Sequence, residues 1–377
     1  MNLPKHPSNT KQPMAFGSLR NLLSLVRQHG IDRPYWRRFL FVLVNTTWTA
    51  PLRWYGRIRY GRFVRQTPIN HPPLFILGHW RNGTTYLYNL LSQDPAFIHI
   101  TLTQIMAPEL FLPAGPILEK LFRRLGPSQH YLSRQAFNPN VPSEEEFALA
   151  NLSPYSLYHF WSFPRQAQFF LNRYVFFRDA SPKEREAWKS CYRQLLQSLI
   201  FYGGDKPLLL KNPPNTGRVP ILLEMFPDAR FIFILRNPYK VYKSAHKFYR
   251  KILPMTSLQD ITEAEVDQIM FSFYRQLMQE YLQTRHLIPS ENLVEIKLEA
   301  LSAAPLPELH RIYTSLRLPG WETAEPRLQR FVQNGPFQPP PPYTLTAAEI
   351  EQVNQEWGFA FDAWGYEMLP AKDGQAV

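Results

Sequence analysis

Short apolar runs alternate with longer amphipathic segments along most of the chain. Residues 74–77, 207–211 and 229–235 are almost wholly apolar, and each run is bounded by Pro, Gly or polar residues. Runs of this length and composition are typical of strands that are buried on both faces of a parallel sheet. Residues 292–301 contain a fourth candidate strand. The pattern therefore predicts a sheet of parallel strands.

The segments between these runs carry helix signals. The clearest helix is expected from Ser181 to Gly204, because Ser is a favoured N-cap, Pro182 suits the first turn and a Gly-Gly pair follows. At residues 142–150, Ser143 is the expected N-cap of a helix with acidic residues in its first turn. Further helices are expected after residue 84 and at 217–226, 237–253 and 260–286.

Alternating strands and helices predict an α/β fold of three layers, with a central parallel sheet flanked by helices. The length of 377 residues suits one large domain with extensions. The expected parts are a flexible lead (1–18), a helical extension of two stretches rich in Arg and aromatic residues (19–70), a main α/β domain (71–335), and a Pro-rich linker with a final helix (336–377).

Composition adds an expectation about partners. The formal net charge is +12, a field that attracts anions such as nucleotides, sulfated or phosphorylated ligands, nucleic acid or an acidic membrane surface. The single cysteine, Cys191, excludes an intrachain disulfide framework and any Cys-rich zinc site. No nucleic-acid-binding module is recognisable, so we expect no nucleic-acid partner. These features lead us to expect a cytoplasmic protein.

The segment from Phe39 to Gly56 begins with an uninterrupted apolar run of six residues. That run is too short to cross a bilayer, which takes about 20 residues. Because arginines flank it on both sides, the segment is either an amphipathic helix lying in a membrane interface or a helix packed on the core. Peripheral membrane contact through these basic, aromatic helices is therefore one of two expectations.

The stretch GHWRNGTT differs by one residue from a Walker A loop, in which backbone N–H groups cradle phosphates and a Lys reaches the terminal ones. Gly78, Gly83 and Thr85 match that motif, whereas Thr84 stands in place of the Lys. A cation, Arg81, lies three residues before Thr84. Because the loop joins a buried strand to a helix N-terminus, it predicts an anion site.

The ends of two other strands indicate which kind of anion. Phosphoryl transfer from ATP needs the loop Lys and a Mg²⁺ held by a strand-end Asp. Here the strands end in Lys211 and Arg236, and no acid follows either apolar run. Ser244 lies eight residues after Arg236, and an Arg with a hydroxyl can hold a second phosphate. The sequence thus favours a metal-free polyanion, and the scattered histidines lack paired metal-ligand spacing.

Together these stretches resemble the PAPS-dependent sulfotransferases, most closely the bacterial branch. Family members carry a strand–loop–helix of the type PRSGTT or PKSGT, where this chain has WRNGTT, and a later Arg and Ser spaced as Arg236 and Ser244 are. The stretch LLLKNP is similar to the family's lysine-bearing strand. The resemblance covers about residues 70–300 and departs from the family at Asn82, where Ser is usual.

The resemblance implies a P-loop-like fold and transfer of a sulfuryl group from PAPS to a hydroxyl or amine by in-line displacement, with PAP as product and no metal. Arg81 and Lys211 would stabilise the leaving oxygen. Family members use either His or Glu as proton acceptor, so the resemblance leaves this role open among His79, Glu144, Glu145 and Glu146. We expect Glu145 or Glu146 first and His79 next. The resemblance assigns donor binding to Gly78, Trp80, Arg81, Asn82, Gly83, Thr84, Thr85, Arg236 and Ser244.

The acceptor is not readable from the sequence. A small molecule, a lipid or a carbohydrate would each suit the high aromatic content of 15%. Asn172, Arg173 and Arg178 are candidates for lining its site. Two alternatives stay open: a P-loop nucleotide kinase or NTPase, and a non-catalytic anion-binding protein at the membrane periphery. The oligomeric state is also open.

Overall fold

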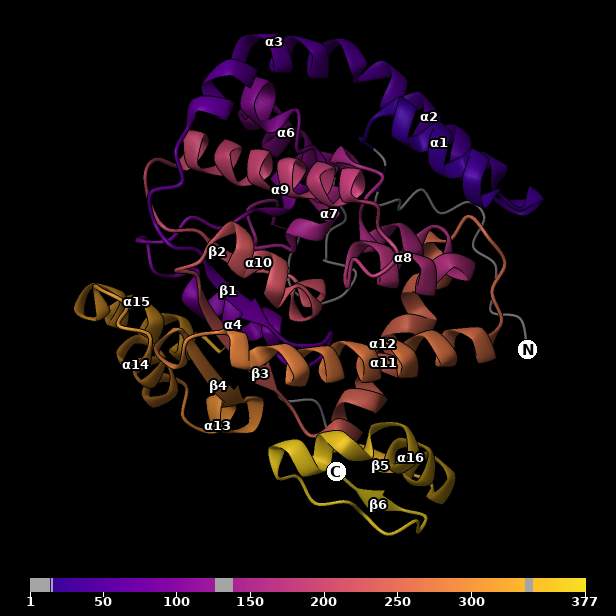
Figure 1. Cartoon of the computed structure of the whole chain (residues 1–377), viewed down its shortest axis with the longest axis vertical. Helices are drawn as coiled ribbons and strands as arrows, with labels where there is room; N and C mark the ends of the chain where they lie inside the picture. The colour runs from indigo at the N-terminus through magenta and orange to yellow at the C-terminus, as the bar shows by residue number, and fades with distance from the viewer. Residues whose placement is uncertain (1–13, 15, 126–137, 336–341) are drawn as a thin grey trace.

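A computed structural model describes residues 14, 16–125, 138–335 and 342–377. Its centre is a sheet of four parallel strands in the order β2-β1-β3-β4 (Figure 1). The strands are β1 (Leu74–Leu77), β2 (Leu209–Lys211), β3 (Arg230–Leu235) and β4 (Leu293–Lys297). The predicted α/β fold with a central parallel sheet is therefore confirmed. Because all four strands run in one direction, their carboxyl ends meet at one edge of the sheet.

The sheet is buried on both faces, as its apolar strands predicted. Successive side chains point to opposite faces, so Phe75 and Leu77 enter one core while Leu74 and Ile76 enter the other. All four of these side chains are buried. One sheet therefore carries two hydrophobic cores, each of which needs a layer of helices.

The two helix layers differ in size. The smaller core is covered by α4 (Thr84–Leu91), α13 (Leu298–Ala303), α14 (Pro305–Ser315) and α15 (Trp321–Gln333). The larger core includes residues of α9 (Pro182–Gly203), α10 (Val219–Met225), α11 (Pro238–Thr256), α12 (Glu263–Thr284) and α16 (Ala347–Trp364). In Figure 1, α13, α14 and α15 gather at the lower left, and α16 lies at the bottom.

Several elements outside the sheet differ from expectation. The N-terminal extension has three helices rather than two: α1 (Leu19–His29), α2 (Trp36–Trp48) and α3 (Ala50–Gln66). Residues 96–180, where the sequence predicted only the helix at 142–150, contain α5 (Leu102–Met106), α6 (Phe111–Leu125) and α8 (Ala167–Tyr174) besides that helix, α7 (Glu145–Leu152). A small antiparallel pair, β5 (Thr344–Leu345) and β6 (Gln375–Ala376), was not predicted. Most of the expected lead (residues 1–13 and 15) and of the linker (residues 336–341) lies outside the described residues.

The expected cap of α7 was wrong. The helix begins at Glu145 with Glu144 as its N-cap, and the Ser143 hydroxyl donates instead to the Val141 carbonyl at 3.2 Å. The Ser143 amide donates to the Ile100 carbonyl at 2.9 Å, which holds this residue in an extended segment beside another part of the chain. A tertiary contact therefore shifts the N-cap from Ser143 to Glu144, which is one residue later.

The start of α9 follows the sequence signal. The Ser181 hydroxyl accepts from the Glu184 amide at 3.3 Å, and the Glu184 carboxylate accepts from the Ser181 amide at 2.9 Å. We expect Ser181→Ala to lower the free energy of unfolding by about 1 kcal/mol, because it leaves a helix-end N–H without its cap. Urea unfolding measures this change. Ser181→Asp keeps a capping oxygen and should lose less; an equal loss in both variants would contradict the capping role.

Candidate active site

The glycine loop between β1 and α4 is shaped by close backbone contacts. Gly78 has a φ of 137°, and a Cβ there would lie 2.5 Å from the Ile234 carbonyl oxygen of β3. Gly83 has a φ of 96°, and a Cβ there would lie 2.5 Å from a methyl carbon of Leu298. As the N-cap of α4, Gly83 has no side chain to occupy the first N–H groups of that helix. These donors are therefore left for an anion.

The other loop residues have distinct places. Trp80 is buried, and its indole N–H donates to the Tyr158 hydroxyl at 3.1 Å. Asn82 is buried and donates to the Ile234 carbonyl at 3.2 Å, so it holds the loop against β3. Thr84 is buried at the start of α4, whereas Thr85 is exposed. Among these four, only Thr85 presents its side chain openly at the helix N-terminus.

Arg81, Arg236 and Ser244 meet although they are far apart in sequence. The Arg81 Nε donates to the Ser244 hydroxyl at 2.8 Å, and the Arg236 Nη1 donates to the Arg81 carbonyl at 3.1 Å. Arg236 ends β3, Ser244 lies in α11, and both are largely buried. The structure thus joins the two predicted phosphate motifs into one region.

The two arginines, Arg81 and Arg236, have no acidic ion-pair partner among the residues that the structure describes. Burial of the guanidinium and then repulsion from Arg236 lower the pKa of Arg81, and burial lowers the pKa of Arg236. Both groups remain charged near neutral pH, because an arginine starts from a pKa above 12. A bound anion would relieve this concentration of positive charge.

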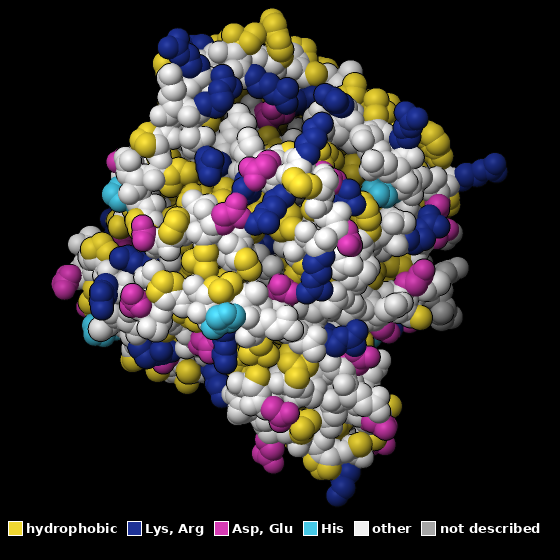
Figure 2. All heavy atoms as spheres, in the orientation of Figure 1, with side chains coloured by type: hydrophobic (Ala, Val, Ile, Leu, Met, Phe, Trp, Pro, Cys, Tyr) yellow, Lys and Arg dark blue, Asp and Glu magenta, His cyan; other side chains and the backbone are white. Residues whose placement is uncertain are grey.

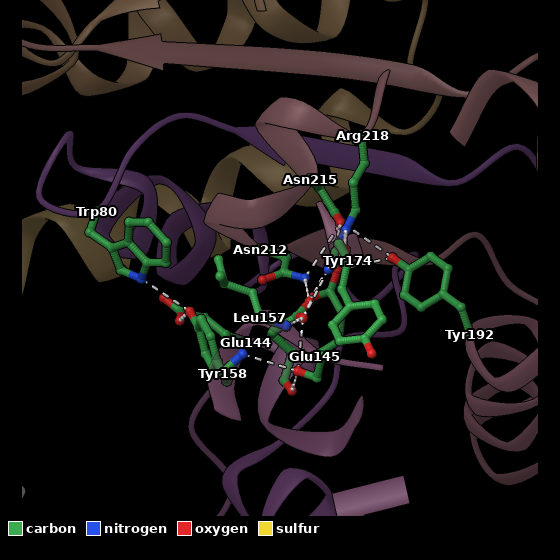
Figure 3. A network of polar contacts seen from close by, with 12 residues as sticks. Trp80, Glu144, Glu145, Leu157, Tyr158, Tyr174, Tyr192, Asn212, Asn215 and Arg218 are labelled. Carbon is green, nitrogen blue, oxygen red and sulfur yellow. Dashed lines mark hydrogen bonds and ion pairs between the residues drawn. The ribbon is translucent and has the colours of Figure 1, made fainter. Parts of the chain in front are cut away.

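Lys211 lies on the other side of the loop, at the end of β2 and opposite Ile76 of β1. Its ammonium forms an ion pair with Glu144 and donates to the Thr85 hydroxyl at 3.3 Å. Glu144 also accepts a hydrogen bond from the Tyr158 hydroxyl. Trp80, Tyr158 and Glu144 follow one another in this chain of contacts (Figure 3). A cation, a carboxylate and two aromatic side chains therefore meet beside the glycine loop.

Glu146 belongs to a fully buried network beneath this region. Its carboxylate binds the Arg218 guanidinium through two contacts of 2.6 and 2.9 Å. It also accepts from Asn212 Nδ2 at 2.7 Å and from the Ser156 hydroxyl at 2.8 Å. Burial alone would raise the pKa of Glu146, but the ion pair and these hydrogen bonds outweigh it and hold the pKa below its usual value. The Glu146 carboxylate therefore has a structural role: it stabilises the buried network, and both of its oxygens accept hydrogen bonds there.

Glu145 points to a different side of the same network. It is fully buried and accepts from the Tyr192 hydroxyl and from Asn215 Nδ2, both at 3.0 Å (Figure 3). Burial raises the pKa of Glu145 to about 7. Its basicity would suit a proton acceptor, but Glu144 is the member of this acidic run that touches Lys211 and Tyr158. The role of Glu145 as base stays a prediction.

His79 is also fully buried. Its Nδ1 lies 2.8 Å from the Trp80 carbonyl oxygen, and its ring packs edge-on against Trp80 and Tyr274. Burial lowers the pKa of His79 to about 3, so the ring is neutral near neutral pH. A group of such low basicity would be a weak proton acceptor.

The acceptor-site candidates are engaged in other contacts. Arg173 pairs with Glu184 of α9 at 2.7 Å, Arg178 pairs with Glu280 of α12, and Asn172 accepts from Gln168 of α8 at 2.8 Å. Among the described residues, no group of three His, Cys, Asp or Glu side chains is arranged to hold a metal ion.

Comparison with known proteins agrees with this geometry. Residues 72–323 match the model of the Sulfotransferase family. The chain is 31% identical over 317 residues to omega-hydroxy-beta-dihydromenaquinone-9 sulfotransferase Stf3 of Mycobacterium bovis and Mycobacterium tuberculosis, which covers 82% of this chain and 79% of the relative. The chain belongs to the sulfotransferase family.

Solved sulfotransferases share its fold. STF9 from Mycobacterium avium superposes with a TM-score of 0.69 at 20% identity, covering 96% of this chain and 98% of that one. STF1 from Mycobacterium tuberculosis gives a TM-score of 0.63 at 17% identity and 90% of both chains. The predicted P-loop-like fold and the resemblance to bacterial sulfotransferases are confirmed, and the kinase alternative loses its support.

Three residues of this candidate site escaped the sequence reasoning. Glu144 was in the acidic run but ranked behind its neighbours, because only the tertiary structure separates three consecutive carboxylates. Tyr158 had no sequence signal, since it lies in a short 3-10 helix of the aromatic-rich middle. Thr216, whose hydroxyl accepts from the Gly78 amide at 2.8 Å, was missed for the same reason.

The raised pKa of Glu145 predicts a penalty to the free energy of unfolding that grows with pH. Its value is 4.5 in the unfolded reference and about 7 in the fold, so the folded protein holds the extra proton between these values and stability falls as pH rises through that window. Glu145→Gln removes this penalty and should therefore stabilise the protein by about 2 kcal/mol more at pH of about 8 than at about 5. Urea unfolding at both pH values measures it; the same change at both would contradict the shift.

Proposed function

We propose that this sulfotransferase moves a sulfuryl group from PAPS to the hydroxyl of an apolar, lipid-like acceptor. The observation that carries the proposal is the meeting of Arg81, Arg236 and Ser244 beside a glycine loop whose helix N–H groups are free for an anion. PAPS carries a phosphosulfate and a separate 3′-phosphate. A loop with one set of donors and a neighbouring Arg–Ser pair suits such a ligand.

The donor-binding roles follow from position. The loop N–H groups with Thr84 and Thr85 would hold the 5′-phosphosulfate, as a helix N-terminus holds anions generally. Arg236 and Ser244, one strand away, would hold the 3′-phosphate. Ser244 already accepts a hydrogen bond from Arg81, so its hydroxyl lies within reach of both anionic groups. Two sites joined by one hydroxyl would fix the orientation of the donor.

The transfer is a direct displacement. A bond forms between the acceptor oxygen and sulfur while the bond from sulfur to the bridging oxygen of the phosphosulfate breaks, and PAP leaves with that electron pair. Arg81 and Lys211 flank the loop and would stabilise the negative charge that develops on the bridging oxygen. Because their positions are held by Ser244 and Thr85, little reorganisation is needed at the moment of reaction.

Glu144 is our candidate for the proton acceptor. It is partly exposed, with 17% of its side chain accessible, and it touches Lys211 and Tyr158. When no donor is bound, the Lys211 ammonium forms an ion pair with the Glu144 carboxylate. An anionic donor at the loop would compete for the Lys211 ammonium and release Glu144 to accept the proton of the acceptor hydroxyl. Lys211 would thereby couple donor binding to the availability of the base.

The surroundings of Glu144 support an apolar acceptor. Tyr158 packs edge-on against Phe147 with ring centroids 4.6 Å apart, and Trp80 continues the aromatic wall. The relative Stf3 is named for an omega-hydroxy-beta-dihydromenaquinone-9 substrate, a hydroxylated lipid-like quinone. A hydroxylated prenylquinone is therefore the first acceptor to try with this chain.

Calorimetry with PAP tests the donor site. We expect binding by the wild type and a loss of affinity of about tenfold or more in both Arg81→Ala and Arg236→Ala, since each removes a charged hydrogen-bond donor. Arg327→Ala, on the exposed face of α15, is the matched control and should bind as the wild type does. Folded wild type without PAP affinity, or unchanged affinity in both variants, would contradict the assignment.

Substitutions of two neighbouring carboxylates test which of them accepts the proton. We expect Glu144→Gln to lower kcat by about 10²–10³-fold, because the amide cannot accept the proton, while PAP affinity is kept within about threefold. Glu145→Gln, one residue away and fully buried, should change kcat by less than about tenfold. Transfer of ³⁵S from labelled PAPS to a hydroxylated prenylquinone provides the rate. The reverse ranking of the two variants would make Glu145 the base.

A further inference from the structure

The helices α2 and α3 expose an unusually apolar face. On α2, Trp36, Leu40, Val44 and Trp48 recur at every fourth position and are all exposed, Trp48 by 81%. Residues four apart lie on one side of a helix, so they form a continuous stripe. On the next helix, α3, Trp54 and Ile58 are also four apart and are exposed by 68% and 62%. We name these six side chains the α2–α3 face.

The opposite side of both helices is fastened to the protein. Arg38 of α2 is buried, and its guanidinium donates to the Pro254 carbonyl at 3.3 Å and to the Ser257 carbonyl. Arg53 of α3 is buried, donates to the Thr46 carbonyl of α2 at 2.6 Å and pairs with Glu109 of the main domain at 3.5 Å. Buried arginines with backbone partners are costly to remove, so the helices cannot readily roll to hide their apolar stripe.

The face lies in a strongly basic part of the chain. Residues 19–66 contain ten arginines, no lysine and one acid, Asp32, which gives +9 of the net charge of +12. Asp32 is itself paired with Arg165 at 2.6 Å. At the upper edge of Figure 2, over α3, hydrophobic side chains protrude among dark blue basic ones. Arg59 and Arg62 are among the exposed arginines beside the stripe.

This combination matches one kind of partner. Tryptophans prefer the headgroup level of a bilayer, long arginine side chains keep their charge in water while their stems lie on apolar surface, and anionic lipids attract basic segments. A second copy of this chain fits poorly, because protein interfaces exclude charge from their cores and two such basic faces would repel each other. No described helix is long and apolar enough to cross a membrane.

We propose that the α2–α3 face docks this sulfotransferase on an anionic phospholipid bilayer, with α2 and α3 lying in the interface. The face is linked to the candidate site by packed helices: α3 contacts α6, α6 contacts α5, and α5 contacts α7, whose N-cap is Glu144. On α6, Ile117 is another exposed apolar side chain, with 69% of its surface accessible. A docked enzyme would thus hold its site near the layer in which an apolar acceptor dissolves.

Vesicle binding tests the proposal with neither donor nor acceptor present, so the result does not depend on the proposed reaction. We expect the wild type to co-sediment with phosphatidylcholine vesicles containing about a quarter phosphatidylglycerol, and at least about tenfold more weakly with pure phosphatidylcholine. Trp48→Ala with Trp54→Ala, and separately Arg59→Glu with Arg62→Glu, should each weaken binding at least about tenfold. Thermal melting and PAP affinity verify that the variants are folded.

A double variant with the same charge change elsewhere tests whether binding depends on the α2–α3 face or only on the overall positive charge of the protein. Arg327→Glu with Arg330→Glu makes the same charge change on the exposed side of α15 and should bind anionic vesicles within about twofold of the wild type. The proposal is overturned if the wild type does not bind anionic vesicles or if the α15 pair weakens binding as much as the α3 pair. A dimer that Trp48→Ala with Trp54→Ala converts to monomer, without vesicle binding, would assign the face to a second copy.

Discussion

The close approach of β3 to the glycine loop is the constraint on which the site depends. Gly78 lies so near the Ile234 carbonyl that any side chain would collide with it, and Asn82 bonds to the same carbonyl. This contact holds the end of β3 and the start of α11 beside the loop, where Arg81 meets Ser244. The anion site is therefore a product of strand packing as much as of loop sequence.

The three consecutive carboxylates Glu144, Glu145 and Glu146 lie in different surroundings and therefore differ in what each can do. Glu146 is locked by Arg218 in the interior, Glu145 is buried with hydroxyl and amide partners, and Glu144 reaches the loop region to pair with Lys211. A rigid, buried anchor two residues from a reactive group limits how far that group can move. In the proposed reaction, the Glu146–Arg218 pair would position Glu144 without touching the substrate.

The proposed donor site and the α2–α3 face suggest that different parts of the protein carry out the reaction and the docking on a membrane. The sheet edge gathers cations that would suit a phosphosulfate, whereas the N-terminal helices, which also expose tryptophans, carry most of the net positive charge. The sheet edge would then bind a water-soluble donor and the α2–α3 face a bilayer. An apolar acceptor that reaches Glu144 from the bilayer would lie beside the buried aromatic pair Trp80 and Tyr158, whose hydroxyl contacts that carboxylate.

The sequence by itself determined the strands, the parallel sheet, the family resemblance and the candidate donor residues, because apolar runs, glycines and helix caps are local signals. It missed the cap of α7, the third helix of the extension and the contacts of Glu144. The α7 cap and the contacts of Glu144 depend on partners from other parts of the chain: the Ser143 amide donates to the Ile100 carbonyl, and Lys211 follows Glu144 by 67 positions. Local patterns cannot rank adjacent carboxylates, because burial and distant charges decide which one meets the substrate.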